Sequence, residues 1–235
     1  MNLTLLAFTP LDWMAFAVFL LCWMGYTRAA INMSRSTPAL ATALHNQRER
    51  WMLNAFTEVR QRQSHDILAI GIFERSVAFF ASTSLIIIAG LLTVLGTSEK
   101  VASVINSLHF AAEVPILQIQ FKLLLLIFLF VHAFFKFCWS MRCYSFLVTM
   151  LGAIPSLKEE DSLEENKRKE WSNRAAGVLS SAAHHFNLGL RVYYFALAVL
   201  AWFISPVLFL VASLVVVAVL YRRDFKSNVL NNLSS

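Results

Sequence analysis

Long apolar stretches alternate with shorter polar ones along the whole chain. A helix needs about 20 mostly apolar residues to cross a hydrocarbon layer about 30 Å thick. The stretches that meet this requirement predict four transmembrane helices, over about 11–31, 76–95, 116–137 and 193–221. The pattern therefore predicts an all-α fold: an integral membrane helical bundle with additional cytoplasmic amphipathic helices, all in a single membrane domain over 1–235.

The first and last of these stretches carry signals of where a helix begins or bends. Thr9, Pro10 and Asp12 supply an N-cap hydroxyl, a proline at the first helical position and an acid near the positive helix end. Ser205-Pro206 lies inside the fourth stretch, where proline removes a backbone hydrogen bond. We predict one kinked span there. The alternative is a re-entrant turn that returns the C-terminal tail to the side from which the helix came.

Two segments between the spans are predicted to be cytoplasmic helices, over about 38–63 and 162–190. In the first, Leu40, Leu44, Trp51 and Ala55 recur at helical spacing among several arginines. Such a helix either lies on an anionic membrane surface or docks on the bundle. The third span also remains apolar to about residue 151, a length of about 54 Å, so its end is expected to project into the cytoplasm.

The positive charges are distributed unevenly over the connections. The chain has 20 Lys and Arg against 14 Asp and Glu, for a formal net charge of +6. The connection between the second and third spans carries only Lys100, whereas the two longer connections are rich in Lys and Arg. The positive-inside rule then predicts a multi-pass protein of the plasma (inner) membrane with cytoplasmic long loops and an outside N-terminus. Four crossings leave the C-terminal tail outside, although it carries Arg222, Arg223 and Lys226, so the side of the tail stays open.

Composition and motifs exclude several classes of function. Apolar residues make up 58% of the chain and charged residues 14%, against about 25% charged in a soluble domain. Outside the spans there is no basic stripe with interleaved aromatic residues, so nucleic acid is not a predicted partner. The three cysteines have neither a metal-binding nor a disulfide spacing. No HExxH, GxSxG, P-loop or GxGxxG motif occurs, so we assign no catalytic, cofactor-binding or metal-binding residue, and nothing in the sequence argues for an enzyme.

The third span has a one-sided polar stripe. Its members fall within about 40° of one line on a helix, because residues advance about 100° each. They are Gln118, Lys122, His132, Lys136 and Ser140. Charged side chains inside a bilayer usually face a bundle interior or a water-filled cavity, so the stripe is a candidate polar pathway. The alternative is that the two lysines extend to opposite membrane interfaces and have no transport role.

A second group of charged residues is predicted near the cytoplasmic ends of the spans. Glu74 and Arg75 begin the second span, and Arg191 precedes the fourth. We predict that they form an interfacial ion-pair network. Ion pairs that fix the helix register are favoured over a role in transport.

The sequence leaves more than one function open. The first hypothesis is a channel or transporter subunit for a small anion or solute. It is expected to form a homo-oligomer in the lipid bilayer, because four helices leave little room for a pore. The alternative is a non-catalytic structural or assembly protein that docks a protein partner on its cytoplasmic helices. A lipid-modifying enzyme is the weakest hypothesis, since no catalytic constellation appears.

Several phrases along the chain are characteristic as a set. They are ERSVAFFAST (74–83), EVP (113–115), FKLLL (121–125), AFFKFCWSMR (133–142), GLRVYYFALA (189–198) and WF (202–203). Through them the chain resembles an uncharacterised membrane family known as domain of unknown function 599, over about residues 11–225. The resemblance implies a multispan membrane protein. It brings no established activity and no site residues.

Overall fold

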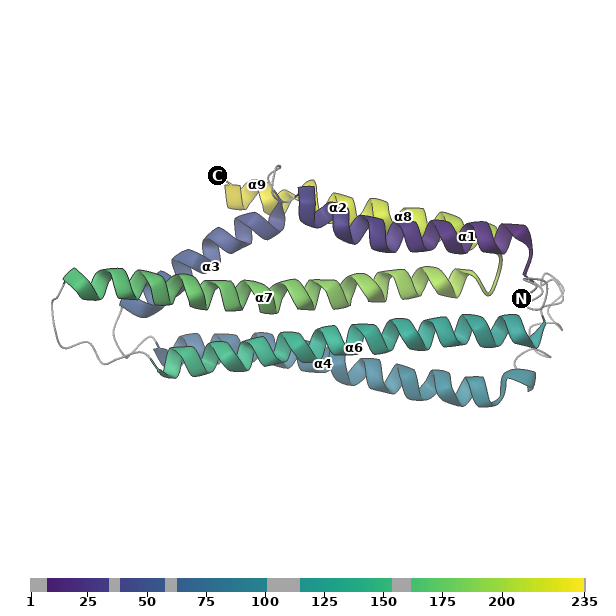
Figure 1. Cartoon of the computed structure of the whole chain (residues 1–235), viewed down its shortest axis with the longest axis horizontal. Helices are drawn as coiled ribbons and strands as arrows, with labels where there is room; N and C mark the ends of the chain where they lie inside the picture. The colour runs from purple at the N-terminus through teal and green to yellow at the C-terminus, as the bar shows by residue number, and fades with distance from the viewer. Residues whose placement is uncertain (1–7, 34–38, 58–62, 101–114, 154–161, 235) are drawn as a thin grey trace.

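The computed structural model describes residues 8–33, 39–57, 63–100, 115–153 and 162–234. Within these residues all regular structure is helical and there is no strand. The elements are α1 (Pro10–Leu20), the π-helical η2 (Leu21–Gly25), α2 (Tyr26–Met33), α3 (Leu40–Thr57), α4 (Gln63–Gly96), α6 (Ile116–Gly152), α7 (Ser162–Ala201), α8 (Pro206–Phe225) and α9 (Asn228–Ser234) (Figure 1). The predicted all-α class is confirmed.

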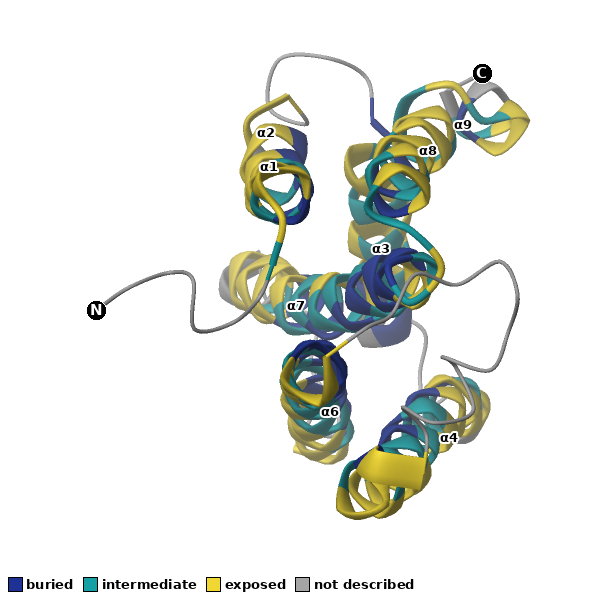
Figure 2. Ribbon diagram, turned by 90° about the vertical axis from the view of Figure 1, so that its right-hand side faces the viewer, coloured by how far each residue is buried: buried dark blue, intermediate teal, exposed yellow. Residues whose placement is uncertain are grey.

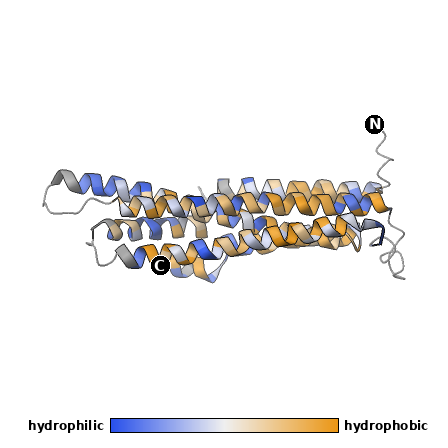
Figure 3. Ribbon diagram, turned by 90° about the horizontal axis from the view of Figure 1, so that it is seen from below, coloured by the Kyte–Doolittle hydropathy of each residue, from blue (hydrophilic) through white to orange (hydrophobic). Residues whose placement is uncertain are grey.

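Four helical segments are long and apolar enough to cross a membrane. They are Pro10–Ala30, His65–Gly96, Ile116–Gly152 and Pro206–Leu230. Hydrophobic residues dominate the half of the bundle toward the N-terminus, and hydrophilic residues gather at the opposite end (Figure 3). This division is the one expected for a bundle that enters the bilayer with most of its length and projects at one end.

Helix α7 lies in the middle of the bundle. Helices α1 and α8 flank it on one side, and α6 followed by α4 flank it on the other (Figures 1 and 2). The most extensive packing joins α6 to α7 and α4 to α6. The faces of α1, α6 and α8 turned toward α7 carry the buried residues (Figure 2). The second half of α7 is thereby surrounded by the apolar helices.

The α6–α7 contact is antiparallel and very close. The Ser140 hydroxyl of α6 donates a hydrogen bond to the carbonyl oxygen of Ala182 in α7, at 2.7 Å. Further along the same pair, Gly189 of α7 faces the fully buried ring of Phe137. A Cβ atom at position 189 would overlap this ring, so any larger residue there would force the Phe137 side chain to move.

The chain reverses direction where one kinked helix was predicted. Helix α7 ends at Ala201, Ser205 is extended (φ −159°, ψ 151°), and α8 begins at Pro206. The Ser205 hydroxyl accepts a hydrogen bond from the amide of Leu208, at 3.1 Å. Proline at a first helical position needs no N–H donor, so Ser205-Pro206 starts a new helix instead of bending an existing one. The prediction of a single kinked span over 193–221 is therefore wrong.

Helix α8 returns antiparallel to α7, and the C-terminal tail changes its end of the bundle as a result. Arg191 of α7 reaches Asp224 of α8 at 2.7 Å. Figure 1 shows that α8 runs toward the end of the bundle at which α6 ends and α4 and α7 begin. Arg222, Arg223 and Lys226 therefore lie toward the end that holds the polar parts of α3 and α7.

Helix α3 docks on the bundle. It packs against α7 and also contacts α8 and α9. Its Met52 is fully buried, and the Trp51 indole donates a hydrogen bond to Asp66 of α4 at 2.8 Å. Of the two predicted placements, docking on the bundle is the one observed. The predicted helix over 162–190 is the first part of α7, which continues to Ala201.

Candidate functional site

Two buried polar groups lie between the helices, one beside the turn that follows α7 and the other beside the middle of that helix. The first, here called the Asp12 network, begins with the predicted cap of α1. The Thr9 hydroxyl accepts a hydrogen bond from the Asp12 amide at 3.2 Å. The amide and hydroxyl of Thr9 donate to the Asp12 carboxylate at 3.0 and 2.7 Å. These contacts form a capping box and confirm the helix start predicted from Thr9, Pro10 and Asp12.

The Asp12 network then extends across the bundle to the turn after α7 and to α6. The second Asp12 oxygen accepts a hydrogen bond from the Trp202 indole at 2.8 Å. The carbonyl oxygen of Trp202 accepts one from the Lys122 ammonium at 2.9 Å. Asp12 and Lys122 are each only 4% exposed, and the Trp202 ring stacks on Phe209 with centroids 4.7 Å apart. All these polar side chains have partners within the network, so it has the character of a structural clamp.

The second polar group is centred on Asp224, near the end of α8. One Asp224 oxygen accepts hydrogen bonds from Tyr26 of α2 and Arg191 of α7, at 2.9 and 2.7 Å. The other oxygen accepts one from the neighbouring Arg223 at 3.1 Å. The side chains of Arg191 and Asp224 are 12% and 15% exposed. Three helices therefore converge on a single carboxylate that is almost removed from solvent.

A cavity of about 440 Å³ adjoins this carboxylate, between α2, α3, α7 and α8. We call it the Asp224 cavity. Its polar lining consists of Thr42, His45, Arg48, Ser180, His184, Asn187, Arg191, Arg223 and Asp224. The volume lies within the range of about 300–1,000 Å³ that is typical of small-molecule sites. Three guanidinium groups face one carboxylate, so the lining has a positive balance of charge.

Two of the arginines in this cavity have unused binding capacity. Arg48 is half-buried, and burial lowers the pKa of its guanidinium. No carboxylate pairs with Arg48 among the residues that the structure describes. The Nε atom of Arg191 is buried and has no hydrogen-bond partner in the described part of the chain. A partly desolvated cation without a counter-charge is costly, and an anion in the cavity would remove that cost.

The residues of the predicted polar stripe point toward other parts of the structure. Gln118, Lys122 and Ser140 are buried, and His132 and Lys136 are half-buried. Lys122 and Ser140 donate to backbone carbonyl oxygens at the end and in the middle of α7. None of the five lines the Asp224 cavity. The contacts of Lys122 and Ser140 are those of helix packing, and a role of the stripe in conduction stays a prediction.

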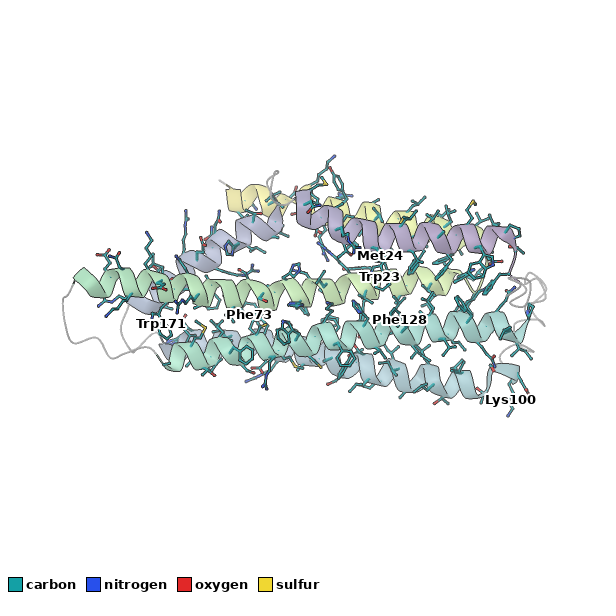
Figure 4. All side chains as sticks on the ribbon, in the orientation of Figure 1. Trp23, Met24, Phe73, Lys100, Phe128 and Trp171 are labelled. Atoms are coloured by element: carbon teal, nitrogen blue, oxygen red, sulfur yellow. The ribbon has the colours of Figure 1, made fainter. Side chains whose placement is uncertain are left out.

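His132 lies among aromatic rings. The Trp23 ring of η2 meets it edge-on, with centroids 5.8 Å apart, and the Phe128 ring stacks on it at 6.5 Å. Figure 4 labels Trp23 and Phe128 on their two helices. This environment joins the first span to α6 and separates His132 from the cavity.

The charged partner of Arg191 is Asp224 and not the predicted Glu74. The Ser84 hydroxyl of α4 lies 2.9 Å from the Tyr193 hydroxyl of α7, so these two positions are level. Glu74 lies ten residues before Ser84, about 15 Å back along α4. Glu74 is half-buried, Arg75 is exposed, and neither lines the cavity. Arg191 therefore pairs with Asp224 of α8, and the predicted network of Glu74, Arg75 and Arg191 is not formed among the described residues.

Sequence reasoning missed Asp224, Arg223 and Arg48 as members of one site. A single kinked span places Asp224 and Arg191 on opposite sides of the membrane, so their pairing was not considered. The signal that pointed to them was the violation of the positive-inside rule by Arg222, Arg223 and Lys226. The alternative of a turn at Ser205-Pro206 removes that violation.

Comparison with protein families yields a match over residues 14–229 to the family described as "Protein of unknown function, DUF599". The chain belongs to this family. The match includes Arg48, Arg191, Arg223 and Asp224. Comparison with curated proteins and with solved structures found no match. Within the described residues, no three His, Cys, Asp or Glu side chains are grouped closely enough to hold a metal ion.

Proposed function

We propose that this DUF599 protein is a multi-pass membrane protein that binds an anionic ligand in the Asp224 cavity. The observation that carries the proposal is Arg48, a half-buried cation that lines the cavity without a carboxylate partner among the described residues. Arg191 and Arg223 supply two further guanidinium groups. Guanidinium groups bind carboxylate and phosphate oxygens with paired, charge-assisted hydrogen bonds.

The proposal includes a membrane topology with five crossings. The second half of α7 runs beside α6 between two contacts, Ser140 with Ala182 and Lys122 with Trp202. It therefore lies at the same depth as the apolar part of α6. His184, His185 and Arg191 lower the hydropathy of this half, which explains why apolar length alone does not identify it as a span. We place the N-terminus outside and the C-terminus in the cytoplasm.

Five crossings agree with the charge distribution better than four do. Arg222, Arg223 and Lys226 then lie on the cytoplasmic side, together with the basic connections. The Asp224 cavity lies on the same side, near the membrane surface. We also keep the plasma (inner) membrane as the proposed location, because positive-inside asymmetry is the basis of the assignment.

The binding proposal is tested with the purified full chain in detergent and inorganic phosphate or sulfate as the probe. Arg48→Gln is expected to lower the affinity at least tenfold, because a hydrogen bond to a charged group contributes about 1.5–3 kcal/mol and 1.4 kcal/mol corresponds to tenfold. Arg50→Gln is the matched control, since Arg50 is on the same helix, is exposed and does not line the cavity. Calorimetry or ligand-dependent thermal stabilisation measures the affinity. Equal affinities for the two variants and the unmodified protein would refute the proposal.

The topology is tested by cysteine labelling in sealed vesicles. Ser227→Cys, just after α8, is expected to react with a membrane-impermeant maleimide only when the cytoplasmic face is accessible. The same substitution in a chain with its native cysteines replaced by serine gives a clean readout. Labelling from the outer face would show that the tail is outside and that α7 and α8 do not both cross.

A further inference from the structure

An exposed apolar stripe on α8 leads toward the Asp224 cavity. Four of its members recur at intervals of three or four residues, so they lie along one face of the helix. They are Leu208, Val211, Val215 and Val219, with Leu214 next to Val215, and all five are between 41% and 53% exposed. Val219 lies one helical turn before Arg223. Apolar side chains that would face lipid tails are thus continuous with a cation of the cavity.

Arg223 also belongs to a second hollow on the outside of α8. This hollow, of about 350 Å³, is lined by Val219, Arg222, Arg223, Lys226, Ser227 and Asn228. Among the described residues, this lining contains three cations and no acid. Because Arg223 is shared, a phosphate at this position contacts the cavity on one side and the outer hollow on the other.

Aromatic rings support the cations at this level. The Arg223 guanidinium lies over the Tyr194 ring, 5.7 Å from its centroid, and the Lys226 ammonium lies over the Tyr221 ring at 5.8 Å. Tyrosine is enriched at the membrane–water interface, where lipid headgroups lie. Juxtamembrane clusters of Lys and Arg on the cytoplasmic side attract anionic lipids.

We infer that the ligand is the phosphate headgroup of an anionic phospholipid, with its acyl chains along the α8 stripe. The inference rests on the proposed anion site and specifies its ligand. A soluble phosphate carries the same chemistry in the cavity, but it makes no use of the apolar stripe or of the outer hollow. A lipid makes use of the cavity, the outer hollow and the apolar stripe. Its acyl chains would lie along the valines of α8, its glycerol beside Arg222 and Lys226, and its phosphate in the cavity.

The test compares three probes on the full chain in detergent: phosphatidylglycerol, phosphatidylcholine with the same acyl chains, and inorganic phosphate. Native mass spectrometry measures lipid binding, and thermal stabilisation measures phosphate binding. Phosphatidylglycerol is expected to bind at least tenfold more tightly than phosphatidylcholine. The double variant Arg222→Gln/Lys226→Gln is expected to lower phosphatidylglycerol affinity about tenfold and to leave phosphate affinity within twofold, because neither residue lines the Asp224 cavity.

The matched control is Arg75→Gln/Arg174→Gln, which removes the same charge from two exposed positions away from both hollows. Equal binding of the two lipids, or no effect of the Arg222/Lys226 variant on phosphatidylglycerol, would overturn the inference. If inorganic phosphate then still binds and still depends on Arg48, the proposed anion site stands and its ligand is a soluble phosphate. If Arg48→Gln changes the binding of neither probe, the proposed function itself fails.

Discussion

The Asp12 network and the Asp224 cavity are built from the same kinds of residue. They differ in how many of their charged and hydrogen-bonding groups lack a partner within the protein. Each has a carboxylate from one helix, a cation from another and an aromatic partner. In the Asp12 network both carboxylate oxygens and the Lys122 ammonium are engaged, and stacked rings fill the surroundings. In the Asp224 cavity one carboxylate serves two arginines, a third arginine lacks an acid among the described residues, and open space adjoins them.

This difference shows how a polar residue in a membrane bundle is to be interpreted. Burying a charge is costly in both places, so each polar group must be compensated. Where the protein supplies all the compensation, the group joins helices. Where cations outnumber acids beside a cavity, the remaining compensation comes from solvent or from a ligand, and the proposal above assigns it to an anionic ligand. The predictions below test this distinction, from the largest expected effect to the smallest.

Removal of the carboxylate from the Asp12 network should have the largest effect on stability. Asp12→Leu leaves the Trp202 indole without an acceptor and Lys122 without a nearby negative charge, and it removes a helix cap. We expect a loss of about 3–5 kcal/mol in the free energy of unfolding, as for other broken buried charge arrangements. Denaturant unfolding in detergent measures it. Asp12→Asn, which keeps one acceptor oxygen, should lose clearly less. Equal losses would contradict the interpretation of the network as a charge clamp.

The addition of a methyl group at position 189, between α6 and α7, should have the next largest effect on stability. Gly189→Ala forces the buried Phe137 ring to move, and overpacking of this kind costs about 1–3 kcal/mol. Gly177→Ala on the same helix is the control, because nothing lies within 4 Å of its added Cβ. It should stabilise the helix by about 0.5–1 kcal/mol. Thermal unfolding of both variants measures these changes in stability. Adding Phe137→Leu to Gly189→Ala should restore part of the lost stability, because the smaller side chain makes room for the methyl group.

Loss of the Thr9 hydroxyl should cost less. Thr9→Ala removes the side-chain acceptor at the start of α1 and one donor to the Asp12 carboxylate. The expected loss is about 0.5–2 kcal/mol, the usual range for an N-cap. Thr9→Ser retains both contacts and should behave like the unmodified protein in the same unfolding measurement. A Ser variant as unstable as the Ala variant would assign the effect to the lost methyl group.

Substitution of Arg48 in the Asp224 cavity is expected to have the smallest effect on the stability of the ligand-free protein. Arg48→Gln should change the free energy of unfolding by less than about 0.5 kcal/mol without added anion, because no acid depends on Arg48 in the described structure. With saturating phosphate, the unmodified protein should gain stability and the variant should gain much less. A large loss of stability without anion would place Arg48 among the structural residues and remove the contrast between the two regions.

Much of this architecture follows from local sequence signals. The apolar stretches predicted the all-α class, and Thr9, Pro10 and Asp12 predicted the start of α1, because a cap acts within four residues of the chain. The interpretation of Ser205-Pro206 was wrong, since the same dipeptide permits a kink or a reversal. Packing of α8 against α1, and the pairing of Asp224 with Arg191, select the reversal.

The sequence by itself determined that the chain is a bundle of apolar helices with one strongly basic side, because hydropathy and charge act through composition over tens of residues. Only the tertiary structure decided which polar residues share a site. Lys122 and Trp202, which are in contact, and Arg48 and Asp224, which line one cavity, lie far apart in sequence, and nothing local brings them together. Their grouping depends on one reversal of direction, which brings the end of α8 back beside α2, α3 and the middle of α7.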